Sequence, residues 1–383
     1  MGNYRWLILA AGTLSATSLA AVQIGVSAIA PELRDAFHLS FAQVGVVLAA
    51  TNAGMTVTFL AWGIVTDRIG ERPALTVGLV GAALSLVVAA KAHTFGTLVP
   101  ALAATGAFAA SVNSASGRAV MHWFPRDERG LALGIRQASV PLGGFFGALG
   151  LPAIVSHRGV HAAFYVLAAN CALWAVLAAL VLRDRDVDEH VAEELRSPMR
   201  DPRMWLLCGG SALVLAGQFA IMVFVVLFLH DARGLSTGRA AIVLAAIQVG
   251  GAITRIVVGK LSDRTGRRIP LFVRISALLA VSLAATAALV HAPLPLLIPV
   301  LVVAGTLGMS WNGLSFTAAA EAAGARRSGA AIGFQQTILA LAGLVIPIWF
   351  AALVSSASWR AAFLAAAACS LAGALLLRRL AAL

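Results

Sequence analysis

Charged residues are scarce in this sequence. They make up 11% of its 383 residues, whereas a soluble domain carries roughly 25%. Apolar residues make up 60%, and the mean hydropathy is +0.90. This balance excludes an ordinary soluble protein and indicates a chain surrounded by lipid.

Long polar segments are also lacking, apart from one stretch at 183–203 that is too short for a catalytic domain. The rest consists of apolar blocks of about 20 residues or more, the length that a helix needs to cross roughly 30 Å of hydrocarbon. Because lipid offers the backbone no hydrogen-bond partner, these blocks must be helices. We predict an all-α membrane protein with twelve transmembrane helices. The predicted spans are 5–32, 42–66, 73–91, 95–121, 128–155, 160–182, 203–229, 237–262, 269–290, 294–320, 328–354 and 359–379.

Only three cysteines are present, Cys171, Cys208 and Cys369, and each lies inside a predicted span, which gives no disulfide framework. The sequence also lacks a glycine-rich lysine loop for phosphate, a His/Glu metal motif and a nucleophile–base set within the spans. We therefore predict no enzymatic activity, no cofactor and no metal site. Without an ATP site, gradients of ions or substrates must drive any transport.

The formal net charge of +12 would suggest nucleic acid in a soluble protein, but topology explains it better. If both termini are cytoplasmic, cytoplasmic loops and helix ends carry 20 of the 28 Lys and Arg residues. The external loops then carry six, which are Arg34, Lys91, Arg158, Arg233, Arg239 and Arg360. This asymmetry follows the positive-inside rule. We predict a multi-pass protein of the bacterial inner membrane with cytoplasmic termini, lipid around it and no nucleic-acid partner.

An internal repeat divides the chain. The segment 63–72, Gly-Ile-Val-Thr-Asp-Arg-Ile-Gly-Glu-Arg, returns at 259–268 as Gly-Lys-Leu-Ser-Asp-Arg-Thr-Gly-Arg-Arg. When the two halves are aligned, Asn113 matches Asn312. Residues of the fifth span match residues of the eleventh: Gly130, Ala132, Gly134, Gln137 and Gly144 correspond to Gly329, Ala331, Gly333, Gln336 and Gly343. We predict two pseudo-symmetric six-helix bundles, 1–182 and 203–383, joined by a cytoplasmic linker at 183–202. A parallel repeat of this kind is typical of transporters whose binding site lies between the halves.

The repeated Gly-x-x-x-Asp-Arg-x-Gly-Arg-Arg loop resembles the signature of the major facilitator superfamily, which stands between helices 2 and 3 and again between helices 8 and 9. The resemblance covers the whole chain and implies the major facilitator fold. It also implies that these loops latch the halves in one state, through Gly63, Asp67, Arg68, Gly70, Arg72, Gly259, Asp263, Arg264, Gly266, Arg267 and Arg268. Each aspartate can pair with arginine or cap a helix N-terminus. A role as topology determinants alone is the alternative. Glu71 replaces a usual basic residue, which we expect to weaken the local charge network.

Acidic residues are missing from the middles of the predicted spans, since all 16 lie in loops or at helix ends. Two arginines do lie inside. Arg255 is eight residues before Asp263, about 12 Å into its span, and Arg136 is seven residues after Arg129, about 10 Å in. Charge within a bilayer is costly and marks a functional candidate. Because guanidinium stays protonated, we expect the substrate to supply the neutralising charge.

Arginine presents a planar fork that suits carboxylates and similar oxyanions, so we predict a small anionic substrate. The predicted substrate-binding residues are Arg136, Arg255, Gln137, Asn113, Gln248, Asn312, Gln335 and Gln336. The placement of Arg255 is similar to that of the helix-8 arginine of monocarboxylate, oxalate and nitrate carriers, and 123–143 resembles cyanate-permease-like members. Monocarboxylate carriers place an acid one turn before their arginine, where Gly251 stands in this chain.

Structural roles are the alternative for these residues. Arg136 can extend to the cytoplasmic surface or brace helix contacts, each amide can bond a neighbouring helix, and Trp311 can either line the site or pack. Arg118, close to the end of its span, is predicted at the membrane interface. Pro141 and Pro347 predict kinks in spans 5 and 11.

Together these features predict a secondary active transporter that moves a small organic anion by alternating access, coupled by antiport or proton symport, and functional as a monomer. A proton-coupled drug exporter is one alternative, although such exporters commonly need a carboxylate within the membrane. A facilitator of a neutral solute, with structural arginines, is the other.

Overall fold

The computed structural model describes residues 3–183 and 197–381, and the acidic run of the predicted linker, 184–194, lies outside them. Within these ranges the chain forms helices and no strand, and eleven helical stretches are long and apolar enough to cross a membrane. The longest, Arg129–Val181, has 53 residues, about 80 Å of helix and far more than the roughly 30 Å hydrocarbon core. It breaks at Gly159, whose φ of 76° is not helical. This stretch therefore supplies two spans, and the predicted twelve are confirmed.

The helices form two compact units. Unit 1 consists of Met1–Pro125, Ile135–Pro198 and Ala320–Thr337, and unit 2 consists of Arg126–Gly134, Met199–Ala319 and Ile338–Leu383. Each unit therefore holds most of one sequence repeat and a short piece of the other. The two exchanged pieces begin the fifth and eleventh spans.

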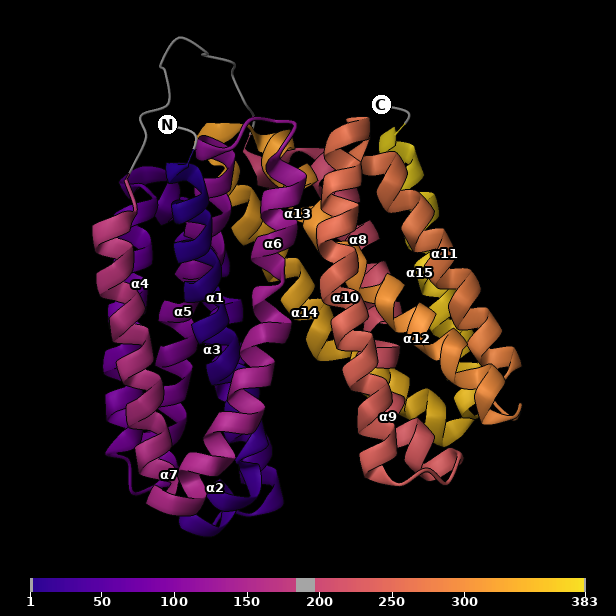
Figure 1. Cartoon of the computed structure of the whole chain (residues 1–383), viewed down its shortest axis with the longest axis horizontal. Coiled ribbons are helices and arrows are strands. Elements are labelled where there is room, and N and C mark those ends of the chain that lie inside the picture. The colour runs from indigo at the N-terminus through magenta and orange to yellow at the C-terminus, as the bar shows by residue number, and fades with distance from the viewer. Residues whose placement is uncertain (1–2, 184–196, 382–383) are drawn as a thin grey trace. The chain divides into compact units, whose positions relative to one another are not determined.

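Unit 1 is a bundle of long helices that run side by side (Figure 1). Its helices are α1 (Tyr4–Ala28), α2 (Ala30–Ala36), α3 (Phe41–Ile69), α4 (Glu71–Ala90), α5 (Phe95–Trp123), α7 (Ser139–Val181), η3 (Ala325–Arg327) and the first part of α14 (Ser328–Ser356). Helix α1 packs on α7, α3 on α5, and α4 on both α5 and α7. Small residues permit these contacts, since a Cβ at Gly147 would lie only 2.7 Å from the Ala21 carbonyl oxygen.

Local signals fix the ends of α3. Ser40 accepts from the Gln43 amide while the Gln43 side chain accepts from the Ser40 amide, so the two residues form a capping box. At the other end Gly70 has a φ of 90°, which turns the chain directly into α4. A residue with a Cβ is strained at such an angle.

Unit 2 repeats this arrangement. Its helices are α6 (Arg129–Gln137) as far as Gly134, η1 (Pro198–Arg200) from Met199, α8 (Pro202–Met222), α9 (Val225–Leu227), the π-turn η2 (Phe228–Ala232), α10 (Thr237–Thr265), α11 (Arg268–Ala288), α12 (Leu294–Ser310), α13 (Asn312–Ala323), the rest of α14, and α15 (Trp359–Ala381). Helix α11 packs on α15, α15 on α8, and α10 on α12. The α4–α7 contact of unit 1 thus returns as the α11–α15 contact.

Two proline predictions concern helix shape. Pro141 has no N–H to bond the Gln137 carbonyl, and the chain breaks at this point, where α6 ends and α7 begins at Ser139. The break between α6 and α7 thus falls within one turn of Pro141. Helix α14 continues through Pro347 without interruption.

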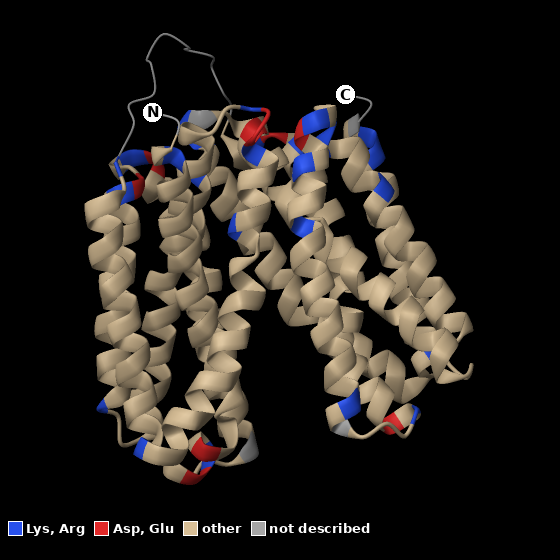
Figure 2. Cartoon of the chain, in the orientation of Figure 1, with Lys and Arg blue, Asp and Glu red and all other residues tan. Residues whose placement is uncertain are grey.

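Charged residues gather at the helix ends of each unit, and the middles of the helices carry few (Figure 2). The acidic residues that the structure describes lie at the ends of spans, in connections or in the short α2; they are Glu32, Asp35, Asp67, Glu71, Asp127, Glu128, Asp201, Asp231, Asp263 and Glu321. The interior is thus apolar except for amides, hydroxyls and a few arginines.

Candidate functional site

Arg255 lies in α10 of unit 2, with 4% of its surface exposed. Its Nε donates to the Met309 carbonyl oxygen at 2.7 Å, and its Nη2 donates to Asn312 Oδ1 at 3.2 Å. The last carbonyls of α12 have no helical partners, because α12 ends at Ser310 and α13 begins only at Asn312. The helix dipole favours a cation at this end. Two predicted site residues, Arg255 and Asn312, are therefore in direct contact.

Two glutamines lie on the helices around this pair. Gln218 of α8 accepts from Asn312 Nδ2 at 3.5 Å, so it joins the group, although it is not among the predicted site residues. Gln248 lies two turns before Arg255 in α10, half-buried, with its Oε1 shielded from solvent. Unit 2 thus joins Arg255, Asn312 and Gln218 in one hydrogen-bonded group, while Gln248 lies seven residues before Arg255 in α10.

Two further residues of unit 2 prove to be packing positions. Trp311 is fully buried and stacks on Phe272 with ring centroids 5.4 Å apart. A Cβ at Gly251 would lie 2.6 Å from Met309 Sδ. The acid that monocarboxylate carriers hold at this position has no room in this chain.

Arg136 lies near the end of α6, and its side chain is turned into unit 1, with 1% of its surface exposed. Its Nη2 is 3.9 Å from the place that a Cβ would take at Gly117 of α5, and Ile332 Cδ1 of α14 is 2.5 Å from the same place. The guanidinium therefore reaches inward to α5 and α14. The alternative in which it extends to the cytoplasmic surface is excluded.

Predicted amides lie close to these contact points in the sequence. Asn113 lies one turn before Gly117 in α5, and Gln335 and Gln336 lie one turn after Ile332 in α14. Gln137 follows Arg136 directly. Residues three or four apart share a helix face. Gln137 and Gln335 are buried, and the other two are half-buried. Gly117 and Ile332 thus lie within one turn of three predicted site residues of unit 1.

The first copy of the repeated loop caps a helix. Asp67, at the end of α3, accepts from the Gly329 amide at 2.9 Å and from the Ala330 amide at 2.8 Å. These two amides belong to the first turn of α14. A carboxylate at a helix N-terminus satisfies donors that have no helical partner and is favoured by the helix dipole.

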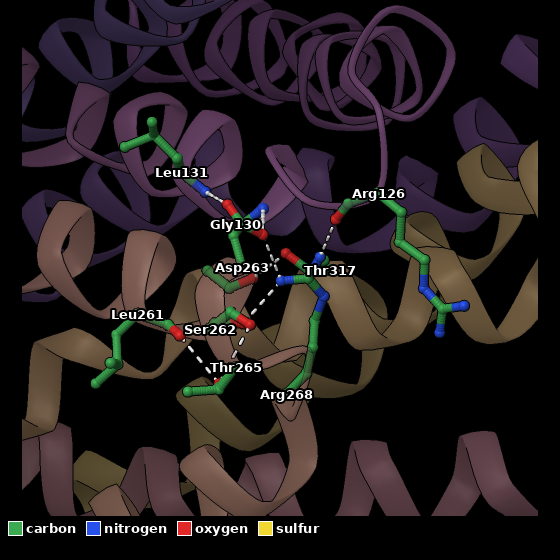
Figure 3. A network of polar contacts seen from close by, with 10 residues as sticks. Arg126, Gly130, Leu131, Leu261, Ser262, Asp263, Thr265, Arg268 and Thr317 are labelled. Atoms are coloured by element: carbon green, nitrogen blue, oxygen red, sulfur yellow. Dashed lines mark hydrogen bonds and ion pairs between the residues drawn. The ribbon is translucent and has the colours of Figure 1, made fainter.

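The second copy makes the same contact in unit 2 (Figure 3). Asp263 accepts from the Gly130 amide at 2.8 Å and from the Leu131 amide at 2.7 Å, in the first turn of α6. Arg268 Nη1 donates to Asp263 Oδ1 at 2.7 Å, and its Nη2 donates to the Arg126 carbonyl oxygen at 2.7 Å. The two copies are therefore equivalent in their helix-capping contact.

Glycines allow the close contact of α3 with α14 and of α10 with α6. A Cβ at Gly63 would lie 2.5 Å from the Gly329 carbonyl oxygen, and one at Gly259 would lie 2.2 Å from the Gly130 carbonyl oxygen. Gly70 and Gly266 both have positive φ, of 90° and 62°. The remaining predicted latch residues, Arg68, Arg72, Arg264 and Arg267, are exposed.

The first copy differs in its charged partners, and here one sequence prediction, that Glu71 weakens the charge network, is wrong. Arg118, predicted at the interface, is 7% exposed and pairs with Asp67 at 3.2 Å and with Glu71 at 2.8 Å. Glu71 is 1% exposed and also contacts His122 Nδ1 at 2.5 Å. Glu71 therefore does not weaken the charge network but forms part of it. We name these four side chains, Asp67, Glu71, Arg118 and His122, the buried charge cluster.

A signal for this cluster was present in the repeat. Arg118 falls on Thr317 of the second repeat, and Glu71 falls on Arg267. Compared with the second repeat, the first repeat therefore has one basic residue fewer in the loop and one more in the helix that carries Arg118. Such a paired departure from symmetry indicates a new ion pair.

Comparison with known proteins agrees with the fold and the repeated loop. The family model described as Major Facilitator Superfamily matches residues 8–347. An uncharacterised MFS-type transporter of Mycobacterium tuberculosis is 32% identical over 364 residues, which are 94% of this chain and 81% of that protein. The fucose:proton symporter FucP of Escherichia coli has a TM-score of 0.79 at 16% identity, over 98% of both chains.

Two relatives are named for their substrates. "Probable sulfoacetate transporter SauU" of Cupriavidus necator is 26% identical over 376 residues, 87% of this chain and 83% of that protein. The "Hexuronate transporter" of Escherichia coli is 28% identical over 193 residues, 50% of this chain and 44% of that protein. The chain belongs to the major facilitator superfamily. It is a multi-pass membrane transporter of small solutes and not an enzyme, as the sequence predicted.

Proposed function

We propose that this transporter moves a small organic anion by alternating access. The observation that carries the proposal is Arg136, which is 1% exposed and whose Nη2 lies close to Gly117 of α5. A buried group that stays charged gains from an anionic partner. Its planar fork matches a carboxylate or a sulfonate.

The named relatives support an anion. Sulfoacetate carries a carboxylate and a sulfonate, and a hexuronate carries a carboxylate; proteins named for these substrates are similar to this chain. A neutral-solute facilitator with structural arginines is the competing function. Only Arg255 favours this competing function, because its side chain has a structural role: it holds the end of α12 through Met309 and Asn312.

The two arginines therefore have different proposed roles. Arg136 binds the anion directly, with hydrogen bonds from Asn113, Gln137, Gln335 and Gln336. Arg255 fixes the α12–α13 break of unit 2 through Met309 and Asn312.

We propose that the two capping contacts act as latches during alternating access. Each aspartate holds the first turn of a helix from the other repeat, Asp67 on α14 and Asp263 on α6. Only a few hydrogen bonds hold each turn, so the contact can form in one state and break in another. Glycines at 63 and 259 keep the surfaces smooth enough for this.

The cellular setting follows from charge and span number. Twelve spans put both termini on the same side of a membrane, and the excess of Lys and Arg in the loops on that side supports a cytoplasmic location for it. We propose the bacterial inner membrane, a functional monomer in lipid, and coupling by antiport or by proton symport.

Ligand binding tests the anion directly. Purified protein is heated with galacturonate, with sulfoacetate and with galactose as the uncharged control. We expect the anions to raise the unfolding temperature and galactose to leave it unchanged, and Arg136→Gln to abolish the anion effect. A shift with galactose that survives Arg136→Gln favours the neutral-solute facilitator and overturns the proposal.

A further inference from the structure

A cavity of about 360 Å³ lies in unit 1, between α1 and the two arms into which Gly159 divides α7. Its wall is formed by residues within 14–21 of α1 and within 146–154 and 166–174 of α7, all of them in unit 1. The volume is in the range of small-molecule sites, about 300–1,000 Å³. None of the wall residues is charged, so the cavity offers no ionic partner to a small anion.

The cavity lies at the depth of the lipid chains. Counted from the break at Gly159, the wall extends along the first arm from Ile154, at about 8 Å, to Phe146, at about 20 Å. Along the second arm it extends from Val166, at about 10 Å, to Trp174, at about 22 Å. Because the hydrocarbon core is roughly 30 Å thick, both walls lie within it and run in the direction of the lipid chains.

The helix surface beside the cavity is apolar. Leu14, Phe146 and Val166 line the cavity and are themselves exposed, so it is not sealed inside the bundle. The exposed residues of 163–181, on the second arm, are all uncharged, and apart from Tyr165 all are apolar. Since polar side chains within spans face a protein interior or water, this surface faces lipid.

The few polar side chains in the wall form hydrogen bonds within the protein. Thr17 donates to the Thr13 carbonyl oxygen at 2.9 Å, and Asn170 Nδ2 donates to Ser18 Oγ at 2.7 Å. The rest of the wall is aliphatic, aromatic or glycine. Apolar cavities stay dry and take apolar guests, so the occupant of this cavity is a hydrocarbon group.

Gly150 keeps the cavity open. One turn earlier, Gly147 is needed for the contact of α7 with α1, since a Cβ there would lie 2.7 Å from the Ala21 carbonyl oxygen. A Cβ at Gly150 would meet nothing within 4 Å, although Gly150 lies in the cavity wall. The glycine at position 150 therefore serves no helix contact, and its missing side chain enlarges the cavity.

We propose that the cavity between α1 and the two arms of α7 binds one acyl chain of a membrane phospholipid. The bilayer supplies such chains at this depth, and an empty space would leave the wall atoms without the contacts that a chain provides. A free fatty acid fits less well, because the wall has no cation for its carboxylate. A phospholipid keeps its head group at the membrane surface. Arg136 is not part of the wall, so this site is independent of the proposed anion site.

Photo-crosslinking of the intact protein in detergent tests the proposal. Phosphatidylethanolamine with a diazirine in the middle of one chain is added in increasing amounts, and labelled residues are identified by mass spectrometry. We expect labelling of 146–154 and 166–174 to saturate at a single lipid per protein. Labelling of Leu84 in α4, which is exposed and outside the cavity, is expected to rise without saturation. Labelling of the cavity segments that rises in parallel with that of Leu84 would overturn the proposal.

A variant that fills the cavity gives a second test. Gly150→Leu is expected to reduce labelling of 146–154 and 166–174 severalfold and to leave labelling of Leu84 unchanged. Gly45→Leu is the matched control, because a Cβ at Gly45 also meets nothing within 4 Å and Gly45 lies outside the cavity. Full labelling of the cavity segments in folded Gly150→Leu protein would contradict the proposal. If Gly150→Leu does not fold, saturation in the unaltered protein still decides.

Competition separates this site from the anion site. Galacturonate in excess is expected to leave labelling of 146–154 and 166–174 unchanged, because the wall has no charged residue. If galacturonate displaces the chain, the cavity belongs to the transport site and the proposal fails. If labelling saturates but no organic anion binds to the protein, the proposed transport function fails and the acyl-chain site stands.

Discussion

At the scale of single residues, polar side chains in this protein are placed by the ends of helices. Arg255 occupies the carbonyl end of α12, and Asp67 and Asp263 occupy the amide ends of α14 and α6. Each group satisfies backbone atoms that the helix itself leaves without partners. This explains why so few charges are found elsewhere within the spans.

Sequence reasoning located residues whose depth follows from their position along a helix. The depth of Arg255 and the repeat match of Asn113 with Asn312 led to a pair that is in contact. It did not reveal the partners of Arg118, because distance from a helix end gives depth and not the face on which the side chain lies. Arg118 and Glu71 are 47 positions apart, and only the fold brings them together.

The buried charge cluster predicts strong coupling between its members. Arg118→Ala leaves two buried carboxylates without their cation, so we expect a loss of about 3–5 kcal/mol in the free energy of unfolding. Adding Glu71→Ala removes one of those carboxylates and is expected to restore part of this loss. Denaturant unfolding in mixed micelles measures both. Effects that simply add would show that the pair is not coupled.

At the scale of helices, close approach through glycine determines which elements meet. The first turn of α14 lies against α3 because Gly63 has no side chain, and the first turn of α6 lies against α10 because of Gly259. The sequence singled out both glycines as part of the repeated loop. The exchange of these two turns between the compact units could not be predicted, because it depends on tertiary contacts.

Gly63→Ala tests this approach, because its Cβ would lie 2.5 Å from the Gly329 carbonyl oxygen. We expect a cost of about 1–3 kcal/mol from the displaced backbone and faster hydrogen exchange at 328–332. Gly45→Ala is the control in the same helix, since nothing lies within 4 Å of its Cβ. Equal exchange in both variants would show that α3 and α14 are not in tight contact.

At the scale of the whole molecule, twelve spans and the distribution of Lys and Arg set the topology. The number of spans depended on recognising that Arg129–Val181 breaks at Gly159. Hydrophobic length predicted this well, because no single helix of that length fits a bilayer. The substrate is harder to predict from the sequence, since it depends on a few side chains rather than on a pattern along the chain.

Reporter fusions test the orientation. Alkaline phosphatase, which is active only outside the cytoplasm, is fused after residue 200 and, in a second fusion, after residue 234. We expect the first fusion to be inactive and the second to be active, because the positive charges favour a cytoplasmic linker. The reverse pattern would contradict the proposed orientation.

The central claim is that Arg136 binds an organic anion, and transport into vesicles tests it most directly. Galacturonate and sulfoacetate uptake is measured in reconstituted vesicles for the unaltered protein, Arg136→Gln, Arg136→Lys and the exposed control Arg158→Gln. Loss of a charge-assisted pair costs about 1.5–3 kcal/mol, so Arg136→Gln is predicted to lower kcat/KM by about ten- to a hundredfold. Arg136→Lys is predicted to be intermediate because it keeps the charge and loses the fork. Anion uptake by Arg136→Gln at the rate of Arg158→Gln would contradict the account.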